Sequence, residues 1–344
     1  MRMKRKNLLT LFCLTLSVVL FSAMIVSAEA KTKMPRVMNV IGHGVGSKLY
    51  GLAAGFAKVG SKNLSTEFKL VPTAGPAEWM PMARDGEVDL AAVISFDGME
   101  GHYGVGFFKG QPSNNMMILL RGGNMRIGPL ARKDSGIKTL KEAKGKRFVL
   151  FSAGRAFSLQ SKGFLANAGL TVDDVKILTV PGPKDGTKAL IEGRADVTGT
   201  AEVTMGVLAE LEAGRGAQYL ALDPSPEGVK RIKSFFPVGQ PILVKPGPGV
   251  RAISEPTWLW TFDWYLSGSK NLSDDVVYEI VKTYWNHDKE LWPIHGGLKQ
   301  TKKEIFVTDD PTFPYHPGAI KFYKEKGVWS SDMDAKQAAL LKKK

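Results

Sequence analysis

The chain has 344 residues, a formal net charge of +14 and a single cysteine, Cys13. This length corresponds to about two domains and is enough to bury a substantial hydrophobic core. One cysteine excludes an intramolecular disulfide framework and a zinc site built from several thiolates. The basic residues are spread along the chain, which argues against nucleic-acid binding. Two interpretations of the positive charge remain: an ordinary basic surface in contact with water, or attraction to an anionic ligand or membrane surface.

The N-terminus has the layout of a cleavable export signal. Four basic residues in the first six positions precede an uncharged, mostly apolar run from Leu8 to Val26. Small residues follow at Ala28 and Ala30, so we expect cleavage after Ala30 and a periplasmic mature chain. An uncleaved membrane anchor is the alternative, because about 20 apolar residues can span a bilayer. Cleavage would leave 314 residues with a charge of about +11 and no cysteine.

The first predicted unit alternates strands with helices. Strands are predicted at 36–41, 67–71 and 90–94, and helices at 49–59 and 77–85. Short connections between such elements imply a parallel sheet that is covered by helices.

The same alternation recurs after residue 125. Strands are predicted at 128–131, 148–151, 175–180, 195–200 and 219–222, and helices at 140–147, after the loop 152–156 to about 168, at 187–192 and at 203–213. The proline- and glycine-rich stretch 237–249 is interpreted as a return crossing, and helices follow at 273–286 and, finally, from about 317. We therefore predict an α/β fold of two lobes with parallel-rich sheets, flanking helices and a hinged cleft. The predicted division is signal 1–30, first lobe 31–124, second lobe 125–236, and return crossing with completion of the first lobe 237–344.

Each predicted lobe has one loop of the same physical kind. The loops at 42–47 and 152–158 both follow a strand and open a helix, where unpaired backbone N–H groups favour an anion. Ligands of open α/β sheets bind beyond the carboxyl ends of the strands, so both loops should border one cleft. Arg155 adds a planar guanidinium suited to a carboxylate. A surface arginine that pairs with an acid is the alternative.

Hydroxyl groups and aromatic rings supply the other candidate ligand contacts. Thr73 and Ser95 follow two strands of the first lobe, and Thr200 ends the matching strand of the second. Aromatic rings at 50, 157, 258 and 260 are candidate apolar walls, although each is more often part of a core. The full set of candidate ligand-binding residues is Gly46, Ser47, Tyr50, Thr73, Gly75, Ser95, Arg155, Phe157, Ser158 and Thr200.

Common catalytic and cofactor motifs are absent from the sequence. The first glycine-rich loop lacks the third glycine of a dinucleotide fingerprint, and Glu67 opens the second strand where the ribose-binding acid should close it. There is no Gly-x-Ser-x-Gly elbow, no His-Glu-x-x-His and no phosphate loop. The five histidines include no close pair at metal-ligand spacing. We expect a binding protein without cofactor or metal, and not an enzyme.

Three stretches of the sequence resemble the TAXI-type receptors of tripartite ATP-independent periplasmic (TRAP) transporters. They are the glycine-rich loop and helix start at 44–53, the Thr-Ala-Gly-Pro and Gly-Glu-Val-Asp segments within 73–91, and Pro-Tyr-His-Pro-Gly with its helix at 314–327. Gly-Arg-Ala-Asp at 193–196 is similar to the equivalent part of the second lobe. The resemblance covers nearly the whole mature chain and implies a two-lobed, type II-like periplasmic binding-protein fold.

The resemblance also implies a function. It implies capture of a small organic anion, such as an amino or dicarboxylic acid, and delivery to integral TRAP permease subunits. By position it assigns Gly46, Ser47, Tyr50, Thr73 and Gly75 to the ligand loops. A ligand-sensing module for a signalling partner and, less favoured, a secreted enzyme are the alternatives.

The ligand loops depart from the family pattern. Trp79 stands where the family has asparagine, and 154–158 reads Gly-Arg-Ala-Phe-Ser instead of Gly-Ser-Gly-Thr. Trp79 and Phe157 would make room for an aromatic or larger apolar anion. Near the C-terminus, His316 is expected to cap the last helix and not to bind ligand.

Overall fold

The structure is a computed structural model that describes residues 32–45, 47–152 and 154–343. Residues Met34–Lys344 form one compact unit. The predicted export signal and its cleavage site lie outside the described residues. Within the described ranges, no helix is both long and apolar enough to cross a membrane.

One mixed sheet runs through this unit. Its order in the described residues is β2-β1-β3-β10-β4-β7-β5-β6, with β8 beside β4 and β9 beside β10. Strand β1 pairs in parallel with β2 and β3, and β5 pairs in parallel with β6 and β7. The strands are β1 (Val37–Gly42), β2 (Glu67–Pro72), β3 (Leu90–Ile94), β4 (Met116–Arg132), β5 (Arg147–Phe151), β6 (Lys176–Val180), β7 (Val197–Glu202), β8 (Ala217–Tyr219), β9 (Gln240–Val244) and β10 (Thr257–Ser269).

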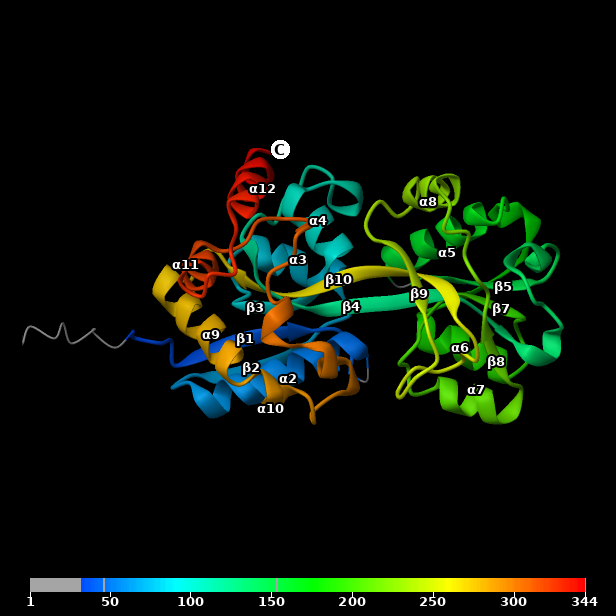
Figure 1. The fold of residues 1–344 in the computed structure, drawn as a ribbon, viewed down its shortest axis with the longest axis horizontal. Helices are drawn as coiled ribbons and strands as arrows, with labels where there is room; N and C mark the ends of the chain where they lie inside the picture. The colour runs from blue at the N-terminus through cyan, green and yellow to red at the C-terminus, as the bar shows by residue number, and fades with distance from the viewer. Residues whose placement is uncertain (1–31, 46, 153, 344) are drawn as a thin grey trace, which may run out of the picture. The chain divides into compact units, whose positions relative to one another are not determined.

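Two long antiparallel strands, β4 and β10, join the halves of the sheet. They pair from Trp260↔Ile127 to Ser269↔Met116, while the end of β4 pairs with β7 and β8. Figure 1 shows them running side by side between two groups of elements. We call the group of β1–β3 lobe I and the group of β5–β8 lobe II. The predicted two-lobed α/β fold is confirmed, whereas the exact residue boundaries of the lobes stay a prediction.

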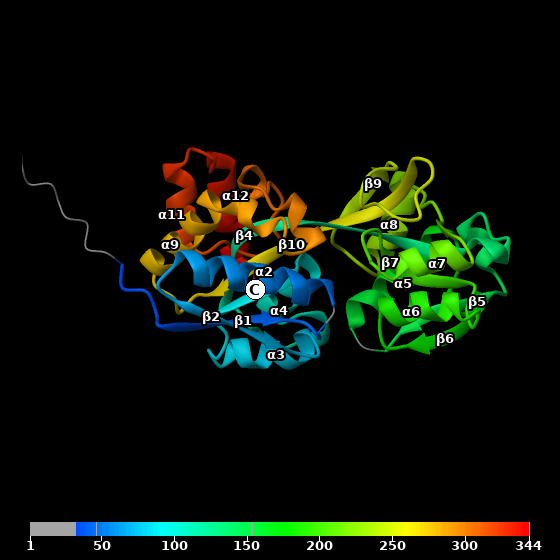
Figure 2. The ribbon, with the colours of Figure 1, turned by 90° about the horizontal axis from the view of Figure 1, so that it is seen from below.

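Helices cover both faces of the sheet in each lobe. In lobe I, α2 lies on one face and α3 and α4 lie on the other, and in lobe II, α5 and α8 lie opposite α6 and α7 (Figures 1 and 2). The C-terminal helices α9 to α12 belong to lobe I. The bounds are α2 (Lys48–Asn63), α3 (Pro76–Arg84), α4 (Ser95–Tyr103), α5 (Arg155–Asn167), α6 (Pro183–Ile191), α7 (Leu208–Gly214), α8 (Pro226–Lys233), α9 (Asp274–Asn286), α10 (Asp288–Leu291), α11 (Pro317–Glu325) and α12 (Ser331–Lys342).

Local sequence explains where the two helices behind the ligand loops begin. Ser47 caps α2 with its side chain, which accepts a hydrogen bond from the Tyr50 N–H at 3.2 Å. Helix α5 starts after Gly154, whose φ of 90° is a conformation that glycine adopts easily. Helix α5 also packs very closely on β7, because a Cβ at Gly199 would lie 2.2 Å from Ser161 Oγ.

Several sequence predictions about the elements are corrected by the structure. The predicted short strand at 128–131 is the end of β4, which starts at Met116. The segment that begins with Ser95 opens helix α4 and is not an extension of β3. Only 3-10 turns occur between Leu140 and Ala143. The helix that begins at Pro317 is not the final one, because α12 follows it.

One prediction near the C-terminus is confirmed. His316 is the N-cap of α11, and its Nδ1 accepts a hydrogen bond from the Gly318 N–H at 3.1 Å. Its side chain therefore orients the helix start.

Candidate functional site

The two predicted ligand loops lie at carboxyl ends of parallel strands. The first follows β1 and leads into α2, and the second follows β5 and leads into α5. Gly46, one of the candidate residues, lies outside the described residues. The neighbouring Ser47 and Tyr50 lie in the cap and first turn of α2.

The first residue of α2 reaches the other lobe. Lys48 Nζ lies 2.9 Å from Oε1 of Glu202, the last residue of β7, and the side chains are only 15% and 9% exposed. Glu202 also accepts hydrogen bonds from the Thr204 N–H, at 2.8 Å, and from the Thr204 hydroxyl. Burial would raise the pKa of Glu202, but Lys48 and Thr204 outweigh it, and the pKa lies below its usual value. A charged and largely buried ion pair therefore joins α2 to β7.

The first residue of α5 makes the reciprocal contact. Arg155 Nη1 donates to Oε1 of Glu100 on α4, and the guanidinium carbon lies 6.0 Å from the centre of the Phe96 ring. The Glu100 side chain is 8% exposed, and its Oε2 accepts a hydrogen bond from the Phe107 N–H at 3.3 Å. In this structure the arginine pairs with an acid. That Arg155 binds a ligand stays a prediction.

Helix electrostatics explain why these two cations matter. Neither α2 nor α5 has an acidic residue in its first turn, and each begins with a basic residue. A positive charge at a helix N-terminus opposes the macrodipole at a cost of roughly 0.3–1 kcal/mol. Lys48 and Arg155 are therefore not placed there for helix stability. Each brings a carboxylate of the opposite lobe to a helix start, which is where an anion is favoured.

A further carboxylate lies near the Arg155–Glu100 pair. Burial and, to a smaller extent, the charge of Glu100 raise the pKa of Asp97 to about 7, although Arg155 acts to lower it. This part of the interface between the lobes thus contains one cation and two acids. An anionic group that displaced Glu100 from Arg155 would leave both acids without a cation.

Most of the predicted hydroxyl contacts have protein partners. Thr73 Oγ1 donates to the Gly42 carbonyl at 2.8 Å, and Ser158 Oγ donates to the Phe151 carbonyl at 2.5 Å. Thr200 Oγ1 donates to Gln160 Oε1 at 3.3 Å. These bonds fix the loops and the first turns of the helices. Ligand contact by these three residues stays a prediction.

The candidate aromatic walls divide into core and partly exposed rings. Trp79 and Trp260 are 1% and 0% exposed and belong to the hydrophobic core. Trp258 is 37% exposed. Tyr50 and Phe157 are half-buried on α2 and α5, and the Phe157 ring centre lies 5.9 Å from that of Phe151. Only Tyr50 and Phe157 therefore combine partial exposure with a place next to the ligand loops.

Several buried polar atoms near the loops have no hydrogen-bond partner within the described part of the chain. They include Nε2 of His43, Oγ of Ser95 and Nε2 of Gln160, and also Lys48 Nζ and Glu202 Oε1, whose 2.9 Å contact is an ion pair without hydrogen-bond geometry. An unpartnered buried polar group costs about 1–3 kcal/mol, so such groups mark places where a ligand or a water is needed. Burial lowers the pKa of His43 to about 4, and its ring is therefore neutral at pH 7.

Sequence reasoning named Ser95 but missed several of these residues. Lys48 carried a usable signal, because a cation that opens a helix is unfavourable by itself. Glu100 and Gln160 carried no such signal in the sequence. Only folding brings Glu100 to Arg155 of α5 and Gln160 to Thr200 of β7. At the remaining positions the structure places Gly75 at the N-cap of α3 with a φ of 130°. Over residues 32–45, 47–152 and 154–343, no cluster of three or more potential metal ligands occurs.

The fold and its paired helix starts define a protein with the two-lobed α/β fold of periplasmic binding proteins. The chain belongs to the NMT1-like family, whose sequence model matches residues 42–327. It is similar to PhnD1 from Prochlorococcus marinus in complex with methylphosphonate, with a TM-score of 0.56, 13% identity, and coverage of 86% of this chain and 99% of that one. It is also similar to a structure described as a periplasmic transporter, with a TM-score of 0.54, 13% identity, and coverage of 89% and 96%. At these identities the likeness concerns the fold alone.

Proposed function

We propose that this protein is an extracytoplasmic receptor that captures a small organic anion between its lobes and delivers it to TRAP membrane subunits. The observation that carries the proposal is the pairing at both helix starts. Lys48 and Arg155 each meet a carboxylate of the opposite lobe. The interface between the lobes thus accepts anionic groups at two places. The related fold of PhnD1, whose structure contains methylphosphonate, supports capture of a small anion in such a protein.

Arg155 is the proposed anchor for the ligand carboxylate. Its side chain is 41% exposed, so a ligand can reach it more readily than it can reach Lys48. The ligand carboxylate would take the place of Glu100 beside the guanidinium. The free N–H groups at the start of α5 and the buried donors of Ser95 and Gln160 would complete its hydrogen bonds.

Among organic anions, the charges favour an amino acid. A ligand with negative charge alone would leave Asp97 and Glu100 facing it without a cation, which is unfavourable away from water. An ammonium group on the same ligand would pair with these acids. Tyr50 and Phe157 are the rings that could contact an aromatic or other apolar side chain, since Trp79 is part of the core.

Location and partners follow from the same proposal. The predicted signal of residues 1–30 would place the mature chain in the periplasm, where membrane permease subunits can receive the ligand. The lobes would comprise residues 31–124 with 237–344, and residues 125–236. A sensing module for a signalling partner is the second candidate, because the same closure could be read by a sensor. No observation in the described residues favours a secreted enzyme.

Isothermal titration calorimetry tests the proposal. Mature protein is titrated with L-amino acids, dicarboxylates and aromatic carboxylates, and we expect one class to bind. Arg155→Ala should weaken that binding by about tenfold or more, because a charge-assisted bidentate contact is lost. Arg194→Ala is the matched control, since Arg194 pairs with Glu192 on an exposed surface. Absence of any binding, or equal affinities for the wild type and Arg155→Ala, would contradict the proposal.

A further inference from the structure

We propose that the Lys48–Glu202 ion pair is a latch that holds the two lobes together in the ligand-free protein. Lys48 opens α2 in lobe I, and Glu202 ends β7 in lobe II. Their contact crosses between the lobes and is made directly by two side chains of this chain. The ion pair would then favour the closed state of the receptor by itself, without a contribution from the ligand.

Glu202 is prepared for this contact by its own lobe. The carboxylate accepts hydrogen bonds from the N–H and the hydroxyl of Thr204, only two residues away in the chain. The strand end itself is fixed by backbone hydrogen bonds on both sides of Val203, from its N–H to Arg126 and from the Arg251 N–H to its carbonyl. These bonds do not involve Lys48, so we expect them to persist when the lobes separate. Closure therefore desolvates a carboxylate that is already oriented and partly shielded.

Lys48 is prepared in the same way by lobe I. The loop before Gly297 packs directly on the first turn of α2, because a Cβ at Gly51 would lie 2.4 Å from the His295 ring. A Cβ at Gly297 would lie 2.9 Å from Lys48 Cε. The lysine side chain is thus confined before it meets Glu202, and less side-chain entropy is lost on pairing.

The pair is of the kind that can hold two surfaces together. Exposed ion pairs contribute little to stability, because water and salt screen them. Here both side chains are largely buried, and the pKa of Glu202 stays below its usual value in spite of burial. The positive end of α2 adds to the attraction for the carboxylate.

A separate set of contacts lies on the other face of the sheet. Arg155 meets Glu100 there, and the Phe96 ring of α4 packs 4.7 Å from that of Phe236. The proposed ligand would compete for Arg155, whereas the Lys48–Glu202 pair is free of that competition. The latch therefore acts in both the ligand-free and the ligand-bound protein.

Distance measurement between spin labels tests the latch directly. The mature chain has no cysteine, so Lys58→Cys on α2 and Lys188→Cys on α6 provide two exposed, unique labelling sites, one on each lobe. The protein is unfolded, dialysed and refolded to remove any bound ligand. Double electron–electron resonance then gives the distribution of distances between the lobes. We expect a dominant short distance in the labelled protein that is otherwise wild type.

Glu202→Gln should move the distribution to longer distances, with a fall in the closed-to-open ratio of about fivefold or more. Glu290→Gln is the matched control, because Lys62 of α2 and Glu290 also pair at 2.9 Å but within lobe I. This control should leave the distribution unchanged. The double variant Lys48→Glu with Glu202→Lys re-forms the ion pair with the charges exchanged, and it should restore the short distance. This result would show that Glu202→Gln acts through loss of the ion pair and not through damage to the fold.

Two results would overturn the latch. One is a ligand-free wild type that shows only the long distance. The other is a short distance that persists in both Glu202→Gln and Lys48→Met. Because the measurement needs no ligand, its outcome is independent of whether titration finds the proposed organic anion.

Discussion

Asp89 and Asp196 occupy equivalent places in the two lobes, where each carboxylate accepts a hydrogen bond from the backbone of a neighbouring strand. Asp89 Oδ2 accepts from the Asn39 N–H of β1 at 2.8 Å, and Asp196 Oδ2 accepts from the Arg147 N–H of β5 at 3.0 Å. Each aspartate directly precedes a buried strand, β3 or β7. Both lie at the amino ends of the strands, away from the ligand loops, so their role is structural.

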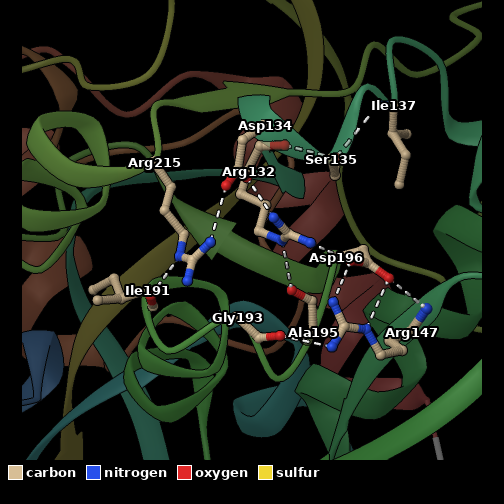
Figure 3. Close-up of polar contacts among 10 residues, drawn as sticks. All are labelled: Arg132, Asp134, Ser135, Ile137, Arg147, Ile191, Gly193, Ala195, Asp196 and Arg215. Atoms are coloured by element: carbon tan, nitrogen blue, oxygen red, sulfur yellow. Dashed lines mark hydrogen bonds and ion pairs between the residues drawn. The ribbon is translucent and has the colours of Figure 1, made fainter.

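Asp196 should be the more important of the two for stability. It also binds the guanidinium groups of Arg147 and Arg132, at 2.6 and 2.8 Å (Figure 3). Asp196→Asn would leave Arg147 without its carboxylate partner and Arg132 with Asp134 alone, and we expect it to lower the free energy of unfolding by about 1–3 kcal/mol. Urea denaturation measures this. Glu192→Gln, which removes an exposed ion pair with Arg194, should change the free energy by less than about 0.5 kcal/mol.

The same substitution has a defined pH dependence. Hydrogen bonds from Arg147 hold the pKa of Asp196 far below its usual range. A depressed carboxyl pKa stabilises the fold above the unfolded value of about 4, and that stability is lost as the pH falls further. The difference between wild type and Asp196→Asn should therefore be complete at pH 7 and shrink below about pH 4. A constant difference between pH 7 and pH 3 would contradict this assignment.

Asp97 should show the opposite behaviour. Burial raises its pKa to about 7, so the folded protein takes up a proton that the unfolded chain releases at lower pH. The fold therefore loses stability as the pH rises from about 4 to about 7, and this loss is complete above about pH 7. Asp97→Asn should be more stable than wild type at pH 8.5, by about 1–3 kcal/mol, with the difference disappearing towards pH 4. Urea denaturation at several pH values checks the sign.

Gly199 should tolerate no side chain, because α5 lies against β7 there. A methyl group would come within 2.2 Å of Ser161 Oγ and 2.9 Å of the Phe148 ring. Gly199→Ala is expected to destabilise the protein by about 1–3 kcal/mol through overpacking against the middle of α5. Gly214→Ala, which meets no atom within 4 Å, should be neutral. Thermal unfolding of the two variants, and recovery of part of the loss by adding Ser161→Gly, test this packing.

Thr73 should act by fixing the second loop of lobe I to the end of β1. Its hydroxyl donates to the Gly42 carbonyl at 2.8 Å and is buried. Thr73→Val keeps the shape but removes the donor, and it should cost about 1–2 kcal/mol because the Gly42 carbonyl loses that partner. Thr73→Ser should retain most of the stability. Equal unfolding free energies for Thr73→Val and wild type would show that this bond is unimportant.

Regular alternation made much of lobe I predictable. The strands β1 and β3 and the helix α2 have buried apolar residues at the spacing that their conformation requires. Helix α4 was missed because glycines interrupt its pattern. In the structure, Gly98 and Gly101 are positions where a Cβ would lie 2.4 Å from Phe313 and from Met80. Glycine there serves close packing against distant segments, which local spacing cannot reveal.

The candidate site was predictable only in part. The positions of the two helix starts follow from the strand–loop–helix order of the sequence. Their partners do not, because Glu202 and Glu100 meet Lys48 and Arg155 only once both lobes have folded and come together. The sequence also did not show the protein partners of Thr73, Ser158 and Thr200, whose contact with a ligand stays a prediction. A hydroxyl at a strand end looks available in the sequence, but nearby carbonyl and amide oxygens take it.

The ribbon formed by β4 and β10 limits how the lobes can move. Two separate connecting chains would permit swivelling in many directions, whereas two strands hydrogen-bonded from Trp260↔Ile127 to Ser269↔Met116 resist being pulled apart. Such a ribbon bends and twists more easily than it splays. We therefore expect the lobes to open by bending and twisting of this ribbon. One twisting movement would bring Lys48 to Glu202 on one face and Arg155 to Glu100 on the other, so that both faces engage together.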